Sequence, residues 1–258
     1  MKVVILAGGR GTRMEEGTDR IPKPMVPVGG KPMLWHIMKY FYKFGYHQFI
    51  ILCGYKGEII RDFFSRYPYN VADRVWYRSG TAVDPRVRGC SYAPEKWEVE
   101  LIDTGELAGT GNRLWRVRDL LKDDFWLTYG DGLGNINLKE AHEWWETDNG
   151  NTVAQVTAVH PPSRFGQLDI VGDRVRNFKE KPMDASWING GFFIISPEIF
   201  TCIHPNTMLE FTTFPTLAHE GNLGVYKHEG FWHPMDTLRD REYLEELWNT
   251  GGAPWKIW

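Results

Sequence analysis

The fold of this chain is decided by the stretch Val3-Val4-Ile5-Leu6-Ala7-Gly8-Gly9-Arg10-Gly11-Thr12-Arg13. It begins with a short apolar run rich in β-branched residues, which is typical of a fully buried parallel strand. The run ends in glycines, whose bare backbone N–H groups can form a concave anion site. Two arginines beside the glycines add positive charge, so the stretch predicts a polyphosphate site. A tight turn without a ligand is the alternative interpretation of the glycines.

Two well-known phosphate-binding motifs do not fit this stretch. A Walker A loop needs a Lys-Ser or Lys-Thr pair after its glycines, and no such pair follows here. A dinucleotide fingerprint needs a third glycine, but the residue at that place, counted from Gly9, is Met14. The missing glycine argues against a nicotinamide oxidoreductase, which is one of the alternative functions.

Composition and charge narrow the class of protein. Of the 258 residues, 42% are hydrophobic and 24% are charged, as in a globular enzyme built on one large domain. The net charge of −3 gives no sign of nucleic acid or an anionic membrane surface as a partner. The three cysteines have no metal-ligand spacing and favour a reducing compartment. We therefore expect a cytoplasmic protein, and the apolar runs are too short to span a membrane.

The order of the predicted elements favours an α/β fold with a mixed, mostly parallel central sheet flanked by helices. Strands are predicted at 3–7, 49–53, 97–102, 125–129, 151–159, 187–195 and 224–228, with a hairpin over 165–179 and an inserted β-ribbon over about 68–100. Helices are predicted from Pro32 to a stop at Gly45, and over about 57–66, 112–121, 138–147, 197–203, 212–220 and 238–249. We divide this single domain, 1–258, into a mainly nucleotide-binding half, 1–135, and a mainly substrate-binding half, 136–258.

Two further segments carry candidate chemistry. Lys23 lies between Pro22 and Pro24, which stiffen the backbone and hold the cation in place beside the glycines. Asp131 follows the predicted strand 125–129, and ligands of open α/β sheets bind beyond the carboxyl ends of the strands. We therefore predict Asp131 as a metal ligand. An exposed lysine and an aspartate in an ordinary turn are the alternatives.

Together these stretches resemble the sugar-1-phosphate nucleotidylyltransferases over nearly the whole chain. The resemblance is carried by Leu6-Ala7-Gly8-Gly9-x-Gly11-Thr12-Arg13, by Glu180-Lys181-Pro182, by Pro234-Met235-Asp236-Thr237-Leu238-Arg239-Asp240, and by the segments 23–25, 29–38, 53–57, 129–132, 164–166, 188–193 and 253–256. Segments 35–38 and 234–240 are most similar to the branch of the family that uses CTP. The resemblance implies a Rossmann-like fold of the nucleotide-diphospho-sugar transferase type, in which the second half contains a small sugar-binding part.

The resemblance also implies an activity and a role for each matching residue. The activity is transfer of a cytidylyl group from CTP to α-D-glucose 1-phosphate, with Mg²⁺ as cofactor. Arg13 and Lys23 are implied as catalytic residues that grip the phosphates. The implied nucleotide-binding residues are Leu6, Ala7, Gly8, Gly9, Gly11, Thr12, Thr110 and Gly111; the sugar-phosphate-binding residues are Glu180, Lys181, Asn189 and Gly190; the metal ligands are Asp131 and Asp236. We expect a homo-oligomer without a nucleic-acid or membrane partner.

Two places depart from the CTP-using branch, and both lie in the half expected to bind the sugar. They are the stretch Leu209-Glu210-Phe211-Thr212-Thr213-Phe214, which is more similar to thymidylyl relatives, and His233. The same reaction with dTTP, UTP, GTP or another sugar 1-phosphate therefore stays open, as does a non-catalytic sugar-nucleotide sensor. Retention of Arg13, Lys23 and both aspartates argues against the sensor.

Overall fold

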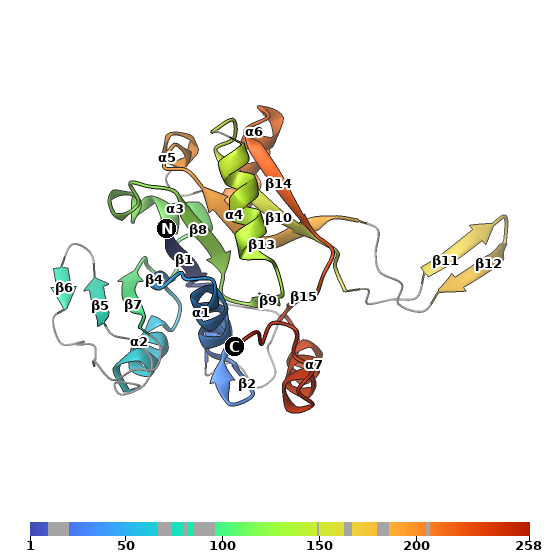
Figure 1. Cartoon of the computed structure of the whole chain (residues 1–258), viewed down its shortest axis with the longest axis horizontal. Helices are drawn as coiled ribbons and strands as arrows, with labels where there is room; N and C mark the ends of the chain where they lie inside the picture. The colour runs from blue at the N-terminus through green and yellow to red at the C-terminus, as the bar shows by residue number, and fades with distance from the viewer. Residues whose placement is uncertain are drawn as a thin grey trace.

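The structure, a computed structural model, describes residues 1–9, 21–66, 74–79, 82–84, 96–148, 150–162, 167–179, 186–204 and 207–258. These residues form one large sheet with helices packed on both of its faces (Figure 1). The strands, in their order across the sheet, are β14 (Leu223–His228), β10 (Ala154–Val159), β13 (Ile188–Ile195), β8 (Phe125–Tyr129), β1 (Lys2–Ala7), β4 (Gln48–Cys53), β7 (Glu98–Asp103), β5 (Arg74–Ser79) and β6 (Ala82–Asp84).

The remaining elements surround this sheet. The helices are α1 (Met33–Lys43), α2 (Gly57–Arg66), α3 (Thr110–Trp115), α4 (Leu138–Thr147), α5 (Ile199–Cys202), α6 (Phe214–His219) and α7 (Leu238–Asn249), with 3₁₀ turns at Lys23–Met25 and Arg118–Leu120 and a π-helical turn at Leu209–Thr213. Short strand pairs are β2 (Pro27–Val28) with β3 (Lys31–Pro32), β9 (Gly132–Gly134) with β15 (Trp232–Pro234), and β11 (Gln167–Val171) with β12 (Arg174–Lys179).

The middle of the sheet is parallel, as the sequence predicts. Strand β1 pairs in parallel with both β4 and β8, so that Leu6 lies opposite Leu52 on one side and Tyr129 on the other. Strands β7 and β5 continue the parallel part, whereas β13 runs antiparallel to β8 and β10. Because β1, β4, β7 and β8 point the same way, their carboxyl ends meet at one edge of the sheet.

Strand β1 is buried on both faces, which explains its unbroken apolar sequence. Val3 and Ile5 pack into one hydrophobic cluster with residues of α1, α4 and α7, including Phe41. The alternate residues Val4 and Leu6 pack into a second cluster with residues of α3, α5 and α6. The strand therefore holds its carboxyl end rigidly between two layers of helices.

Several predicted helix boundaries were wrong. The first helix begins at Met33, with Pro32 as its N-cap residue. The helix predicted over 112–121 is instead α3 followed by a 3₁₀ turn, because Val117 leaves the helical region with a ψ of 9°. The helix predicted over 212–220 is preceded by the π-helical turn Leu209–Thr213. Pro215 has no N–H to donate to the carbonyl four residues before it, so a regular α-helix cannot continue through this point.

The two predicted β insertions differ in how they join the main sheet. Within the described part of 68–100, β5 and β6 extend the edge of the main sheet. The hairpin predicted over 165–179 forms the separate ribbon β11–β12, which projects from the body in Figure 1. No helix of the described residues is both long enough and apolar enough to cross a membrane.

Candidate active site

The predicted phosphate site lies at the shared carboxyl edge of β1 and β8. A hollow of about 320 Å³ opens there, and the predicted residues that line it are Leu6, Ala7, Gly8, Gly9, Lys23, Thr110 and Asp131. The backbone N–H of Gly130 donates to the carbonyl of Leu6, and this hydrogen bond joins the ends of the two strands. This end of the sheet is where ligands of open α/β folds bind.

Lys23 is held as its two neighbouring prolines predict. It begins the 3₁₀ turn Lys23–Met25, and Pro24 packs so closely on the β8 turn that a Cβ at Gly130 would lie 2.7 Å from Pro24 Cγ. The ammonium of Lys23 donates to Asp236 Oδ1 at 2.6 Å and lies 3.8 Å from Asp131 Oδ2. Lys23 therefore lies between the two predicted metal ligands.

The two aspartates meet because a short pair of strands brings their turns together. Strand β9 follows Asp131 and pairs antiparallel with β15, which ends two residues before Asp236. The N–H of Met235 donates to the carbonyl of Asp131 at 2.8 Å, which fixes the two turns against each other. The structure thus brings two residues that are 105 positions apart in the sequence to the same lysine ammonium.

The turn that carries Asp236 is held by Asp240 and His233. The Asp240 carboxylate accepts from the backbone N–H groups of Asp236 and Thr237 and from the Thr237 hydroxyl, which forms a capping box at the start of α7. Buried His233 lies with Nε2 3.1 Å from Asp240 Oδ1. Burial alone would raise the pKa of Asp240, but these hydrogen bonds and His233 lower it overall. His233 therefore shapes the turn below the site.

The charges around Asp131 oppose one another. Removal from water raises the pKa of Asp131, the Lys23 ammonium lowers it, and the Asp236 carboxylate raises it again, with a net increase. Two carboxylates this close to each other favour a cation between them. Lys23 supplies one such cation, and the oxygen donors also suit Mg²⁺, which binds through one or two carboxylates together with substrate phosphates and water. Among the described residues no cluster of three or more His, Cys, Asp or Glu side chains suits a metal.

Arg113 also lines the hollow, and sequence reasoning missed it. The residue is 4% exposed, and its guanidinium donates to the carbonyls of Gly8, Cys53 and Gly105 and to the hydroxyl of Thr104. A Cβ at Gly8 would overlap this guanidinium, which explains the glycine there. Burial lowers the pKa of Arg113. A charged residue on the apolar face of the predicted helix 112–121 was the signal for it.

The sugar-side predictions are only partly described. Asn189 and Gly190 lie in β13; Asn189 Nδ2 is 3.4 Å from the Tyr129 hydroxyl, and the carbonyl of Gly190 accepts from Trp232 Nε1 at 2.7 Å. Gly111 is buried in α3 next to Thr110. The predicted residues Gly11, Thr12, Arg13, Glu180 and Lys181 lie outside the described residues.

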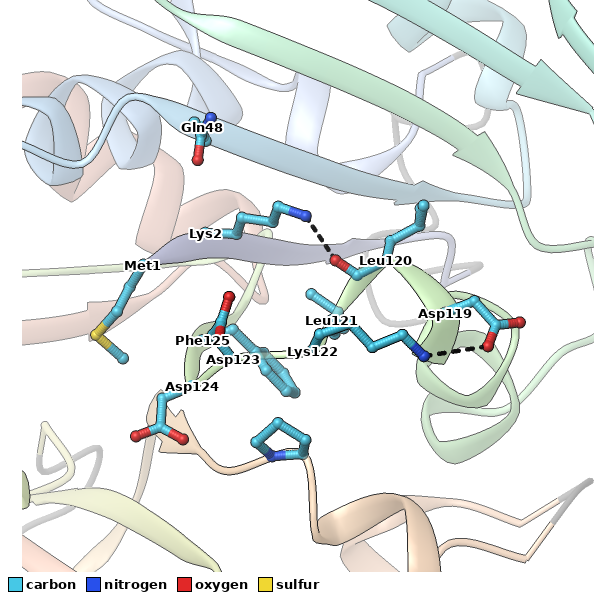
Figure 2. Close-up of a pocket in the computed structure, with 11 residues that line it drawn as sticks. Met1, Lys2, Gln48, Asp119, Leu120, Leu121, Lys122, Asp123, Asp124 and Phe125 are labelled. Atoms are coloured by element: carbon cyan, nitrogen blue, oxygen red, sulfur yellow. Dashed lines mark hydrogen bonds and ion pairs between the residues drawn. The ribbon is translucent and has the colours of Figure 1, made fainter.

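A second hollow, shown in Figure 2, lies at the opposite end of the strands. It measures about 930 Å³ and is lined by the amino ends of β1, β4 and β8, including Lys2, Gln48 and Phe125. Lys2 donates to the Leu120 carbonyl, and none of the predicted site residues lines this hollow. The smaller hollow therefore remains the candidate site.

The sheet order and this carboxyl edge together define a nucleotidyltransferase of the nucleotide-diphospho-sugar transferase fold. The model of a family described as "Nucleotidyl transferase" matches residues 2–235, and the chain belongs to that family. The chain is 45% identical over 262 aligned residues to "Glucose-1-phosphate cytidylyltransferase" of Salmonella typhi, and the alignment covers 100% of both chains. It is 40% identical, again over the full length of both, to "Probable glucose-1-phosphate cytidylyltransferase" of Bacillus subtilis.

Solved structures support the same fold. The crystal structure of HddC from Yersinia pseudotuberculosis is 25% identical, with a TM-score of 0.69 over 96% of this chain and 99% of that chain. A UDP-glucose pyrophosphorylase crystallised with UDP-glucose is 16% identical, with a TM-score of 0.67 over 97% of this chain and 98% of that chain. The second likeness concerns the fold alone.

Proposed function

We propose that this chain transfers the cytidylyl group of CTP to α-D-glucose 1-phosphate, giving CDP-glucose and pyrophosphate. The observation that carries the proposal is the 45% identity, over the full length of both chains, to a glucose-1-phosphate cytidylyltransferase. The site supports the type of reaction, because a fixed lysine, two carboxylates and a glycine turn suit the joining of two anions.

In this reaction an oxygen of the sugar phosphate attacks the α-phosphorus of CTP in line, and pyrophosphate leaves. The attacking phosphate already carries almost two negative charges at neutral pH, since its second pKa is about 6, so no general base is needed. What remains is to align the two anions and to neutralise their repulsion. Lys23 supplies a fixed charge for this purpose, while Arg113 holds the carbonyl of Gly8 and so shapes the turn below the nucleotide.

We propose Mg²⁺ as the metal, bound by Asp131 and Asp236. When bound, it would neutralise charge on the phosphate oxygens. Arg13, Glu180 and Lys181 keep the roles proposed for them on the family resemblance, namely charge stabilisation and sugar-phosphate binding. We further propose a cytoplasmic homo-oligomer, and light scattering of the purified chain tests the oligomer.

The proposal is tested with a matrix of nucleotides and sugar phosphates. The chain is incubated with Mg²⁺, equimolar CTP, UTP, dTTP, ATP and GTP, and one sugar 1-phosphate at a time, and the products are identified by mass spectrometry. We expect CDP-glucose as the main product. A mixture dominated by another nucleotide sugar would leave only the family reaction, whereas nucleotide binding without any product would favour the sensor.

A further inference from the structure

Glu210 binds two residues of the candidate site at once. It lies in the π-helical turn Leu209–Thr213, and its two carboxylate oxygens accept from the hydroxyl groups of Tyr129 and Thr110, each at 2.6 Å. The N–H of Leu209 donates to the same Thr110 hydroxyl at 2.9 Å. A π-helical turn is rare and is frequently found at functional sites. Here it presents one side chain to both β8 and α3.

Glu210 and its hydrogen-bond partners lie between two hollows. Tyr129 and Thr110 line the hollow of about 320 Å³ that Gly8, Gly9 and Lys23 also line. Glu210 and Asn189 line a neighbouring hollow of about 490 Å³, which Trp187 and Phe214 also line. The Asn189 amide lies 3.4 Å from the Tyr129 hydroxyl and extends the hydrogen-bonded chain to β13. The cluster Asn189–Tyr129–Glu210–Thr110 is therefore a polar wall between the nucleotide side and the predicted sugar side.

The wall leaves little room for adjustment. A Cβ at Gly111 would lie 2.7 Å from the carbonyl oxygen of Thr207, and a Cβ at Gly109 would lie 3.0 Å from it. The chain before Glu210 thus packs directly on the segment that carries Thr110. Burial and the nearby Glu210 carboxylate raise the pKa of Tyr129, so its hydroxyl remains a hydrogen-bond donor. A substitution of Glu210 is therefore expected to shift side chains that line both hollows.

We propose that Glu210 is a positioning residue, which holds Tyr129 and Thr110 so that the two substrates meet in line. This inference rests on the proposed function, because only a transfer between two bound substrates requires a fixed relation between the two hollows. Effective in-line attack depends on holding the reacting atoms near 3 Å, and a displacement of about 1 Å is able to cost on the order of a hundredfold in rate. Both oxygens of Glu210 are engaged within the protein, so it acts through its partners.

The test uses variants of the whole chain, each of which changes the hydrogen bonds of one member of the wall. Glu210→Gln keeps the size of the side chain but removes its charge, and Tyr129→Phe removes only a hydroxyl. Thr110→Ser keeps the hydroxyl that Thr110→Val loses. The control Glu220→Gln lies at the exposed C-cap of α6 and makes the same chemical change outside the wall. For each protein we measure kcat, both KM values, CTP binding by calorimetry and the free energy of unfolding.

We expect Glu210→Gln, Tyr129→Phe and Thr110→Val to lower kcat by on the order of tenfold or more, while the Kd for CTP changes less than about threefold. The double variant Glu210→Gln/Tyr129→Phe should lose little more than the worse single variant, since both changes disrupt the same Glu210–Tyr129 hydrogen bond. Thr110→Ser, which keeps the hydroxyl, should lose less kcat than Thr110→Val, and Glu220→Gln should match the wild type.

Two failures are distinguishable. If the wild type makes CDP-glucose and folded Glu210→Gln keeps its kcat, the positioning role is overturned and the proposed function stands. The same holds if Glu210→Gln raises only one KM, since that would make Glu210 a substrate ligand. If the wild type makes no nucleotide sugar, the proposed function fails, and the positioning role fails with it.

Discussion

Lys23 and Asp236 are 213 positions apart in the sequence, and the lysine ammonium donates a 2.6 Å hydrogen bond to the aspartate carboxylate. Asp131 Oδ2 lies 3.8 Å from the same ammonium. One cation thus holds two carboxylates that would otherwise repel each other, at the edge where the glycine turn begins.

The first prediction concerns this lysine. Lys23→Met removes the charge but keeps most of the side-chain volume, so we expect kcat/KM for both substrates to fall by on the order of a hundredfold. Initial rates at varied CTP and glucose 1-phosphate measure the loss. The control Lys122→Met removes an exposed lysine and should have no effect. If Lys23→Met lost affinity for only one substrate, a position of Lys23 between CTP and glucose 1-phosphate would be contradicted.

The second prediction concerns the proposed metal ligands. Asp131→Asn and Asp236→Asn should each lower turnover by on the order of a hundredfold or more, because the site loses part of its charge stabilisation. The variants should need more Mg²⁺ for half-maximal rate. Asp119→Asn, a change at an exposed carboxylate lining the opposite hollow, should need no more Mg²⁺ than the wild type. Full activity of either site variant at ordinary Mg²⁺ would remove its assignment as a ligand.

The third prediction concerns the glycine turn and Arg113. Gly8→Ala should destabilise the fold by about 2 kcal/mol or more, because the added methyl group overlaps the Arg113 guanidinium. Gly9→Ala is the matched control, since a Cβ there meets nothing within 4 Å. Chemical denaturation of both variants measures the difference. Equal stability of the two would show that Arg113 does not occupy the space beside Gly8.

The fourth prediction concerns pH and the buried His36. Burial lowers the pKa of His36 to about 4; Trp255 Nε1 donates to its Nδ1, and its Nε2 lies 2.8 Å from the Val28 carbonyl. This pairing fits the neutral ring. Below pH 6.5 His36 becomes protonated in the unfolded chain but stays neutral in the folded chain. The free energy of unfolding should therefore fall from about pH 6.5 down to about pH 4. The loss is roughly 3 kcal/mol.

Unfolding free energies measured between pH 7 and pH 4 test this prediction. In His36→Gln the acid-dependent loss should be smaller than in the wild type by that amount. The lowered pKa of His228 contributes a similar slope to both proteins, so the difference between them isolates His36. Parallel curves would contradict a neutral, buried His36.

The parallel core of the fold was predictable because its signals are local. The apolar runs at β1, β4 and β8 and the glycine turn after β1 appear in consecutive residues. The prolines around Lys23 likewise predicted a fixed cation. The family resemblance paired Asp131 with Asp236, but their shared position depends on the pairing of β9 with β15, which short segments rich in glycine and aromatic residues do not reveal.

The contacts within the wall and those of the buried Arg113 were not predictable, for a related reason. Glu210, Tyr129 and Thr110 come from three distant parts of the chain, and the π-helical turn that joins them has no sequence pattern of its own. The stretch 209–214 was noticed only as a departure from the CTP-using branch. Arg113 was assigned to no role because its acceptors are mainly backbone carbonyls, which every sequence contains.

The most direct test of the account follows one oxygen atom. Glucose 1-phosphate labelled with ¹⁸O in its phosphate is incubated with CTP, Mg²⁺ and the chain, and the products are observed by ³¹P NMR. We predict equal amounts of CDP-glucose and pyrophosphate, with label in the oxygen that bridges the two phosphorus atoms of CDP-glucose and none in pyrophosphate. Absence of CDP-glucose, or label in the pyrophosphate, would contradict attack of the sugar phosphate on the α-phosphorus of CTP.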